Sequence, residues 1–131
     1  MLNKLIEIGF KKVGKWSLEN GQPELTIFSE ASSANILYSF VVDGVPKYIG
    51  KTTQPLKKRM YGYRKPSLSQ STNIRNNENL KRALCKGLNV ELYVLPDHGL
   101  LHFGCFHLNL AAGLEDSIVS TLSPEWNVVG R

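Results

Sequence analysis

Residues 35–52 read NILYSFVVDGVPKYIGKT, and this stretch decides the predicted fold. Two apolar runs, residues 37–41 and 45–49, flank Asp43-Gly44, a pattern that is typical of a β-hairpin. Each run carries one tyrosine, Tyr38 in the first and Tyr48 in the second. Aromatic residues are common in strands, so the two tyrosines alone indicate no more than packing.

The length of the hairpin loop decides whether the tyrosines share a face, because a one-residue shift turns every side chain over. A two-residue turn makes Tyr48 the partner of Ser39 and places the rings on opposite faces. A three-residue loop with Gly44 in the left-handed conformation makes Tyr38 the partner of Tyr48. The sequence allows both loops. A site that uses both phenols is expected to have the three-residue loop.

Helices and further strands are predicted on both sides of this hairpin. Before it we expect a helix over residues 2–10 and a hairpin of residues 12–18 and 23–29 around Asn20-Gly21. After it we expect a helix from about Thr53, capped by Thr52 or Thr53 and ending before Pro66, then a loop over residues 67–73 and a helix capped by Asn76 or Asn77 and ended by Gly87. The rest of the chain is expected to form a strand over 90–95, an irregular segment over 97–109, a helix over 110–122 and a tail that folds back at Trp126. The predicted fold class is therefore α+β, a small antiparallel sheet flanked by helices.

Length and composition set the broad class. The 131 residues, 42% hydrophobic and 21% charged, are typical of one globular domain. No apolar run is long enough to cross a membrane, and the N-terminus does not have the pattern of a signal peptide. Two cysteines are too few for a disulfide framework, so we expect a cytoplasmic protein.

Positive charge is concentrated just after the hairpin. The net charge is +5, and seven lysines and arginines fall between residues 47 and 65, interleaved with Tyr48, Tyr61 and Tyr63 and interrupted by no acidic residue. A solvated basic face would explain this tract. Nucleic-acid phosphate is the alternative partner.

Two further features have the spacing of a site. Arg59 and Tyr63 are four residues apart in a predicted helix, hence on one face. Glu115 lies in line with Ile118 and Val119 in the last helix. A carboxylate on an apolar stripe is costly unless it reaches solvent, a cation or a metal.

These residues, in this order, resemble the GIY-YIG nuclease family. The YIG triplet is intact at residues 48–50, while residues 36–38 read ILY, with Ile36 in place of the first glycine. The family's helical arginine, its next tyrosine or histidine, its metal-binding glutamate and its late asparagine match Arg59, Tyr63, Glu115 and Asn127. The resemblance covers residues 35–127, and the layout is most similar to the small phage endonuclease II type.

The resemblance implies a single nuclease domain over residues 1–131, with an N-terminal extension over 1–34 and a catalytic core over 35–127. It also implies a metal-dependent DNA endonuclease in which one Mg²⁺ or Mn²⁺ on Glu115 acts as a Lewis acid. We expect Tyr38 to be the general base and Tyr48 to orient or share the proton. Arg59 would hold the phosphate, Tyr63 would position water or phosphate, and Asn127 would hold the frame of the site. The expected DNA-binding residues are Lys51, Lys57, Lys58, Arg64 and Lys65.

Other interpretations remain open at this point. His98, His102, Cys105 and His107 are close enough in sequence for a zinc site, but their spacing matches no zinc motif. A nucleic-acid-binding module without catalysis would also explain the basic tract, and a structural interaction domain would leave the ordered site residues unexplained. One site cuts one strand, so double-strand cleavage would favour a symmetric homo-oligomer.

Overall fold

A computed structural model describes residues 1–128 and confirms the predicted α+β class. The elements in chain order are α1 (Leu2–Glu7), β1 (Lys11–Glu19), β2 (Gln22–Ile27), β3 (Ile36–Val42), β4 (Val45–Thr52), α2 (Leu56–Arg64), α3 (Ser71–Cys85), β5 (Val90–Pro96), β6 (His102–Phe103), β7 (Phe106–His107) and α4 (Leu110–Leu122). None of the helices in this described part is long and apolar enough to span a membrane.

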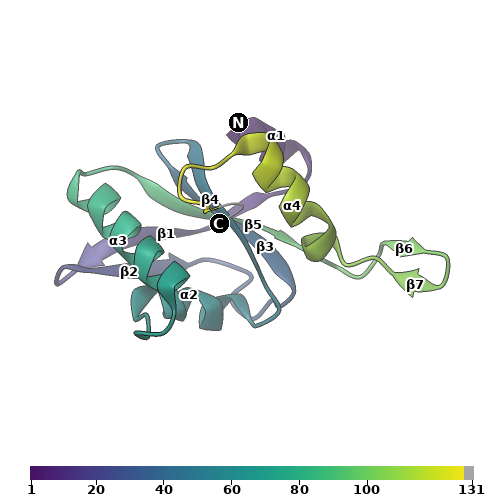
Figure 1. Cartoon of the computed structure of the whole chain (residues 1–131), viewed down its shortest axis with the longest axis horizontal. Coiled ribbons are helices and arrows are strands. Elements are labelled where there is room, and N and C mark those ends of the chain that lie inside the picture. The colour runs from purple at the N-terminus through teal and green to yellow at the C-terminus, as the bar shows by residue number, and fades with distance from the viewer. Residues whose placement is uncertain (129–131) are drawn as a thin grey trace.

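Five strands form one antiparallel sheet in the order β2-β1-β5-β3-β4 (Figure 1). The predicted hairpin at Asn20-Gly21 is confirmed, with both residues at positive φ. Its first strand, β1, pairs with β5, so the segment over residues 1–34 shares the sheet of the core. Strand β4, which carries Tyr48, is at an edge of the sheet.

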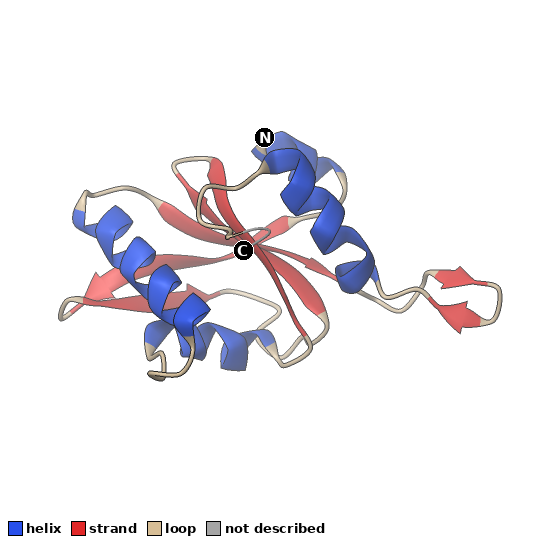
Figure 2. Cartoon of the chain, viewed as in Figure 1, coloured by secondary structure: helices blue, strands red, loops and turns tan. Residues whose placement is uncertain are grey.

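Helices cover both faces of the sheet (Figure 2). On one face, α2 and α3 pack Leu56, Met60 and Leu80 against Phe40 and other strand side chains. On the other face, α1 and α4 pack against the opposite side chains of the same strands. The main members of this second cluster are Leu5, Leu37, Ile49, Ile118 and Val119. Successive side chains along each strand of the β3–β4 hairpin therefore point alternately into these two buried clusters.

The hairpin loop differs from the one that a shared tyrosine site was expected to need. Val42 pairs with Val45, and both Asp43 and Gly44 have positive φ, so the loop is a two-residue turn. The three-residue loop is therefore a wrong prediction. Asp43 tolerates this conformation because its short side chain accepts a hydrogen bond from the Asn89 N–H at 2.9 Å.

A β-bulge restores the register that the turn would have lost. Val41 pairs with Pro46, but Phe40 pairs with Tyr48, so Lys47 is an extra residue in β4. Beyond the bulge Tyr38 pairs with Gly50, which places Tyr38 and Tyr48 on the same face after all. Pro46 has no N–H to donate to a ladder, and edge strands and bulges are where prolines occur in sheets.

Helix α1 ends at Glu7, earlier than the predicted residue 10, and the starts of α2 and α3 also differ from the prediction. Helix α2 begins at Leu56 with Pro55 at its cap, because Thr52 Oγ1 accepts from the Gln54 N–H at 3.0 Å instead of capping. Helix α3 begins at Ser71, so Asn76 and Asn77 are not caps but buried side chains inside it.

The C-terminal third agrees better with the sequence. Helix α4 has the predicted bounds, and the Trp126 N–H donates to the Lys47 carbonyl at 2.8 Å, which confirms that the tail folds back. The segment over 97–109, expected to be irregular, contains the short β6–β7 hairpin, which extends away from the rest of the molecule in Figure 1.

The β3–β4 register makes a prediction about Gly50. A Cβ at this position would lie 2.6 Å from the Tyr38 hydroxyl oxygen and 2.9 Å from a Tyr48 ring carbon. Gly50→Ala should therefore lower the free energy of unfolding by about 1–3 kcal/mol, the usual cost of overpacking. Urea unfolding followed by circular dichroism measures the change.

Gly113→Ala is the matched control, because a Cβ at Gly113 in α4 meets no atom within 4 Å. The same chemical change should there stabilise the protein by up to about 1 kcal/mol through helix propensity. Equal effects of the two substitutions would contradict the close approach of the tyrosines to Gly50.

Candidate active site

Three tyrosines from three elements meet on the α2–α3 face of the sheet. Tyr38 of β3, Tyr48 of β4 and Tyr63 of α2 have ring centroids 6.1–6.3 Å apart. The Tyr38 and Tyr63 hydroxyls are 2.5 Å apart and form a hydrogen bond. Tyr38 and Tyr63 are almost fully buried, whereas Tyr48 is only partly buried. The structure thus brings together the three tyrosines that the sequence singled out.

Arg59 joins this cluster from the same face of α2 as Tyr63. Its Nη2 donates to the Tyr63 hydroxyl at 2.7 Å, and its guanidinium carbon lies 4.2 Å from the centroid of the Tyr63 ring. Its Nη1 donates to Asn73 Oδ1 at 2.8 Å, and Asn73 in turn donates to Gln70 Oε1 at 2.9 Å. Asn73 and Gln70 were missed in the sequence, although an asparagine-rich NIRNN run inside a helix needs partners for its amides.

Burial controls the protonation of the cluster. Burial, and then the neighbouring Tyr48, raise the pKa of Tyr38 well above its usual value, and Arg59 offsets only part of this effect. Burial, and then Tyr38 and Tyr48, raise the pKa of Tyr63 in the same way. Burial alone would lower the pKa of Arg59, but the surrounding tyrosines outweigh it and the pKa is raised. The two buried phenols are therefore neutral and Arg59 is charged at physiological pH.

A polar cavity of about 710 Å³ lies beside the cluster. Its lining comes from around the end of β4, the start of α3 and the start of α4, together with Asn35 before β3 and Arg59 of α2. The residues are Asn35, Lys51, Thr52, Thr53, Gln54, Arg59, Ser69, Gln70, Ser71, Thr72, Asn73, Asn109, Ala111 and Ala112. Among the described residues, the charged side chains in this lining are the cations Lys51 and Arg59. Arg59 connects the cavity to the tyrosines, which do not line it themselves.

Lys51 connects the same cavity to Glu115. Its Nζ lies 3.7 Å from Glu115 Oε1, a long ion pair between β4 and α4. The Glu115 side chain is 29% exposed, so the carboxylate is at the rim of the apolar face of α4 and reaches both a cation and solvent. Within residues 1–128 no group of three or more histidine, cysteine or acidic side chains could hold a metal. A single carboxylate with open access suits Mg²⁺ or Mn²⁺, because Mg²⁺ keeps several waters and adds substrate phosphate oxygens.

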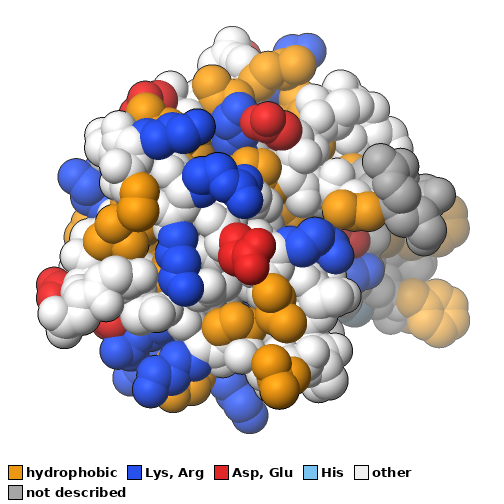
Figure 3. Space-filling model, turned by 60° about the vertical axis from the view of Figure 1, so that its left-hand side comes forward, with side chains coloured by type: hydrophobic (Ala, Val, Ile, Leu, Met, Phe, Trp, Pro, Cys, Tyr) orange, Lys and Arg blue, Asp and Glu red, His pale blue; other side chains and the backbone are white. Residues whose placement is uncertain are grey.

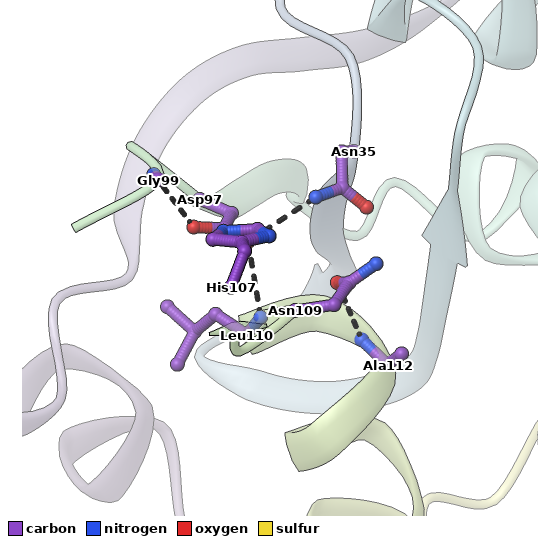
Figure 4. A network of polar contacts seen from close by, with 7 residues as sticks. All are labelled: Asn35, Asp97, Gly99, His107, Asn109, Leu110 and Ala112. Atoms are coloured by element: carbon purple, nitrogen blue, oxygen red, sulfur yellow. Dashed lines mark hydrogen bonds and ion pairs between the residues drawn. The ribbon is translucent and has the colours of Figure 1, made fainter. Parts of the chain in front are cut away.

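A second polar network, drawn in Figure 4, holds the start of α4, the helix that carries Glu115. Asp97 accepts hydrogen bonds from the N–H groups of Gly99 and Leu110, at 2.9 and 3.0 Å, and from Asn35 Nδ2 at 3.2 Å. These backbone donors hold the pKa of Asp97 below its usual value. Asn109 caps the helix by accepting from the Ala112 N–H. No sequence signal identified Asp97, because its partners are up to 62 positions away.

Asn127 is paired with the backbone of the edge strand. Its Oδ1 accepts from the Ile49 N–H at 2.9 Å, and its Nδ2 donates to the Ile49 carbonyl at 2.8 Å. The amide thus replaces the next strand at the residue between Tyr48 and Gly50. In these contacts Asn127 bonds the backbone of β4 and does not touch the tyrosine hydroxyls.

The lysines and arginines between residues 47 and 65 differ in whether a carboxylate pairs with them. Arg64 Nε pairs with Glu24 Oε2 at 2.6 Å, and Lys51 pairs with Glu115. Within residues 1–128 no carboxylate pairs with Lys57, Lys58 or Lys65, which are all exposed. Lysine and arginine side chains are spread over the face in Figure 3, with fewer acidic groups between them.

The residues considered for zinc lie in or next to the β6–β7 hairpin. His102 and His107 pair across the two strands with ring centroids 5.9 Å apart, and both are exposed, as is Cys105. His107 Nε2 is 3.4 Å from Asp97 Oδ2. In the part of the chain that the structure describes, these side chains do not form a metal-binding group.

Two solved structures resemble this fold along most of the chain. A mutant of bacteriophage T4 EndoII matches with a TM-score of 0.74 and 22% sequence identity, over 98% of both chains. The restriction endonuclease HPY188I in complex with product DNA matches with a TM-score of 0.55 and 19% identity, over 91% of this chain and 76% of that one. No protein-family model and no curated protein matches the sequence significantly. The chain therefore has the fold of these two nucleases.

Proposed function

We propose that the chain is a metal-dependent DNA endonuclease of the GIY-YIG type. The observation that carries the proposal is the charged, half-buried Arg59 bonded into a cluster of three tyrosines beside a cationic cavity. Two further observations support it. The fold is that of T4 EndoII and of HPY188I, and the second of these is in complex with product DNA.

Arg59 and Lys51 would bind the scissile phosphate in the cavity that both residues line. A guanidinium offers a planar fork of donors to phosphate oxygens, and a lysine adds a point charge. Donors that are already held in place stabilise developing charge without reorganising during the reaction. Tyr63 would then act through its hydroxyl on Arg59, and not as a base.

Glu115 would hold the divalent ion, Mg²⁺ or Mn²⁺, at the rim of the cavity. When bound, the ion would supply Lewis-acid stabilisation of charge on the phosphate and on the leaving 3′ oxygen. Lys51, which lines the cavity, is joined to Glu115 by the 3.7 Å ion pair. Arg59, which lines the cavity, would stabilise the phosphate charge as well.

The burial of the tyrosines supports a division of roles that differs from the expectation. Tyr38 is 1% exposed and its phenolate is disfavoured by burial, so it is poorly suited to take a proton from water. Tyr48 is the partly buried phenol of the cluster. We therefore assign Tyr48 as the proton acceptor for the attacking water, and Tyr38 as the residue that orients Tyr63 and, through it, Arg59.

The exposed cations of α2 would bind the DNA backbone on either side of the cut. Lys57 and Lys58 have no carboxylate partner within residues 1–128, and Lys65 follows the helix. Arg64 is already paired with Glu24 and would contribute less. Phosphate contacts of this kind give affinity without sequence preference.

The first test is nicking of a supercoiled plasmid. Glu115→Gln should abolish nicking while DNA affinity stays similar, because the metal ligand is lost and the backbone contacts remain. Chelation of divalent ions should have the same effect on the wild-type protein. The control is Asp116→Asn, an exposed neighbour in α4, which should cut normally. DNA binding by a wild-type protein that never nicks would favour the non-catalytic binding module instead.

The second test separates the two tyrosines. Tyr48→Phe should lower kcat by about 10²- to 10⁴-fold, the usual contribution of a positioned general base. Tyr38→Phe removes a buried hydroxyl that bonds the Tyr63 hydroxyl and helps to hold Arg59, so its effect should be smaller. Tyr61→Phe, at a residue 51% exposed on α2, is the control that should leave kcat unchanged. A larger loss in Tyr38→Phe than in Tyr48→Phe would reverse the assignment.

The third test is the salt dependence of DNA binding. Each phosphate contact contributes about −0.9 to the slope of log K against log salt on duplex DNA. Replacing Lys57 and Lys58 by Gln should flatten the slope by about 2 and weaken binding to all sequences alike. Arg64→Gln should change the slope less, because Glu24 already pairs with Arg64. An unchanged slope in the lysine variant would exclude these contacts.

A further inference from the structure

Arg59 is held on two sides, and Asn73 is the partner that lies outside the tyrosine cluster. The Arg59 Nη1 donates to Asn73 Oδ1 at 2.8 Å, and Asn73 is 4% exposed. We propose that Asn73 is a positioning residue that fixes the guanidinium of Arg59 for the scissile phosphate. The proposal rests on the proposed nuclease function and adds a residue to it.

The amide of Asn73 has a defined orientation. Its Nδ2 donates to Gln70 Oε1 at 2.9 Å, at the residue just before α3 begins. Because the donor end of the amide is used by Gln70, the acceptor end is directed at Arg59. Asn73 can therefore accept from the guanidinium without rotating away.

The approach of Asn73 to Arg59 requires space on α2. A Cβ at Gly62 would lie 3.0 Å from Asn73 Nδ2 and 3.4 Å from Arg59 Nη1. Gly62 is in the last turn of α2, and glycine is unfavourable inside a helix. The close approach of Asn73 explains why a glycine is present at this position of α2.

The chemistry of the two anchors suits a residue that must bind phosphate. Asn73 and the Tyr63 hydroxyl are neutral acceptors, so they hold Arg59 without cancelling its charge. They use two of the five N–H groups of the guanidinium, which leaves three for a ligand. Both Arg59 and Asn73 line the cationic cavity, where that ligand would lie.

Asn77 provides a matched comparison on the same helix. It is 5% exposed and lies one turn after Asn73, but its Nδ2 donates to the backbone carbonyls of Tyr63 and Arg64 at 2.8 and 3.3 Å. Asn77 therefore holds the last turn of α2 through the main chain. A loss of Asn77 should affect stability, while a loss of Asn73 should also affect the guanidinium.

The test is a double-mutant cycle in the nicking assay with the full-length protein. Asn73→Leu keeps the side-chain size and removes the acceptor, and we expect kcat to fall by about 10- to 100-fold, as for residues that orient metal ligands, with KM nearly unchanged. In an Arg59→Ala background the same substitution should change kcat by less than about twofold, because non-additivity marks residues that act as a unit. Asn77→Leu should leave kcat near the wild-type value.

A second readout does not need activity. In the ¹H–¹⁵N spectrum of the guanidinium, Arg59 should give separate Nη signals in the wild type and in Asn77→Leu, but merged signals in Asn73→Leu. Wild-type kcat in Asn73→Leu, an equal loss in both backgrounds, or unmerged signals would each overturn the role of Asn73. A wild-type protein that does not nick DNA would instead overturn the nuclease function, and the spectra would still decide whether Asn73 holds Arg59.

Discussion

The bulge at Lys47 is the feature on which the tyrosine cluster depends. The tight turn at Asp43-Gly44 alone would direct Tyr48 away from Tyr38, and the extra residue in β4 turns it back. The C-terminal tail stabilises this bulge from outside. Glu125 pairs with Lys47 Nζ at 2.6 Å, the Trp126 N–H bonds the Lys47 carbonyl, and Asn127 bonds both backbone groups of Ile49. The edge strand is thus covered along the stretch that holds Tyr48.

The two cations that line the cavity have different kinds of partner from the paired cations elsewhere in the described structure. Lys11, Lys12, Lys47 and Arg64 each pair with a glutamate at 2.6 or 2.7 Å. Arg59, by contrast, is anchored by a hydroxyl and an amide, and Lys51 is 3.7 Å from Glu115. A close carboxylate would satisfy a buried guanidinium but would also oppose a phosphate. Neutral anchors offset the cost of burying Arg59 and leave its charge available on the side of the cavity.

The sequence predicted those features whose causes are local. The hairpin at Asn20-Gly21 and the bounds of α4 follow from turn and helix signals within a few residues. The bulge was missed because the effect of Pro46 depends on β4 being an edge strand, which only the sheet order decides. The start of α3 was missed because Asn76 and Asn77 resemble caps until their environment is known, and Asn73 was assigned to the preceding loop. In the structure Asn73 bonds Arg59, and Asn77 bonds the end of α2. The roles proposed for Tyr38 and Tyr48 depend on how deeply each ring is buried under α2. A short sequence motif carries no information about that burial.

Strand β3 connects the two parts of the candidate site. Tyr38 lies in β3 and contacts Tyr63, so the position of this strand sets the place of Arg59. Asn35, one residue before the same strand, bonds Asp97, and Asp97 bonds the first residue of α4, the helix that carries Glu115. The tyrosines and the carboxylate are therefore positioned from one inner strand of the sheet, although helices on opposite faces carry Arg59 and Glu115. A site divided between two layers can keep a fixed geometry only if a rigid strand joins them, and β3, buried along its whole length, is that strand.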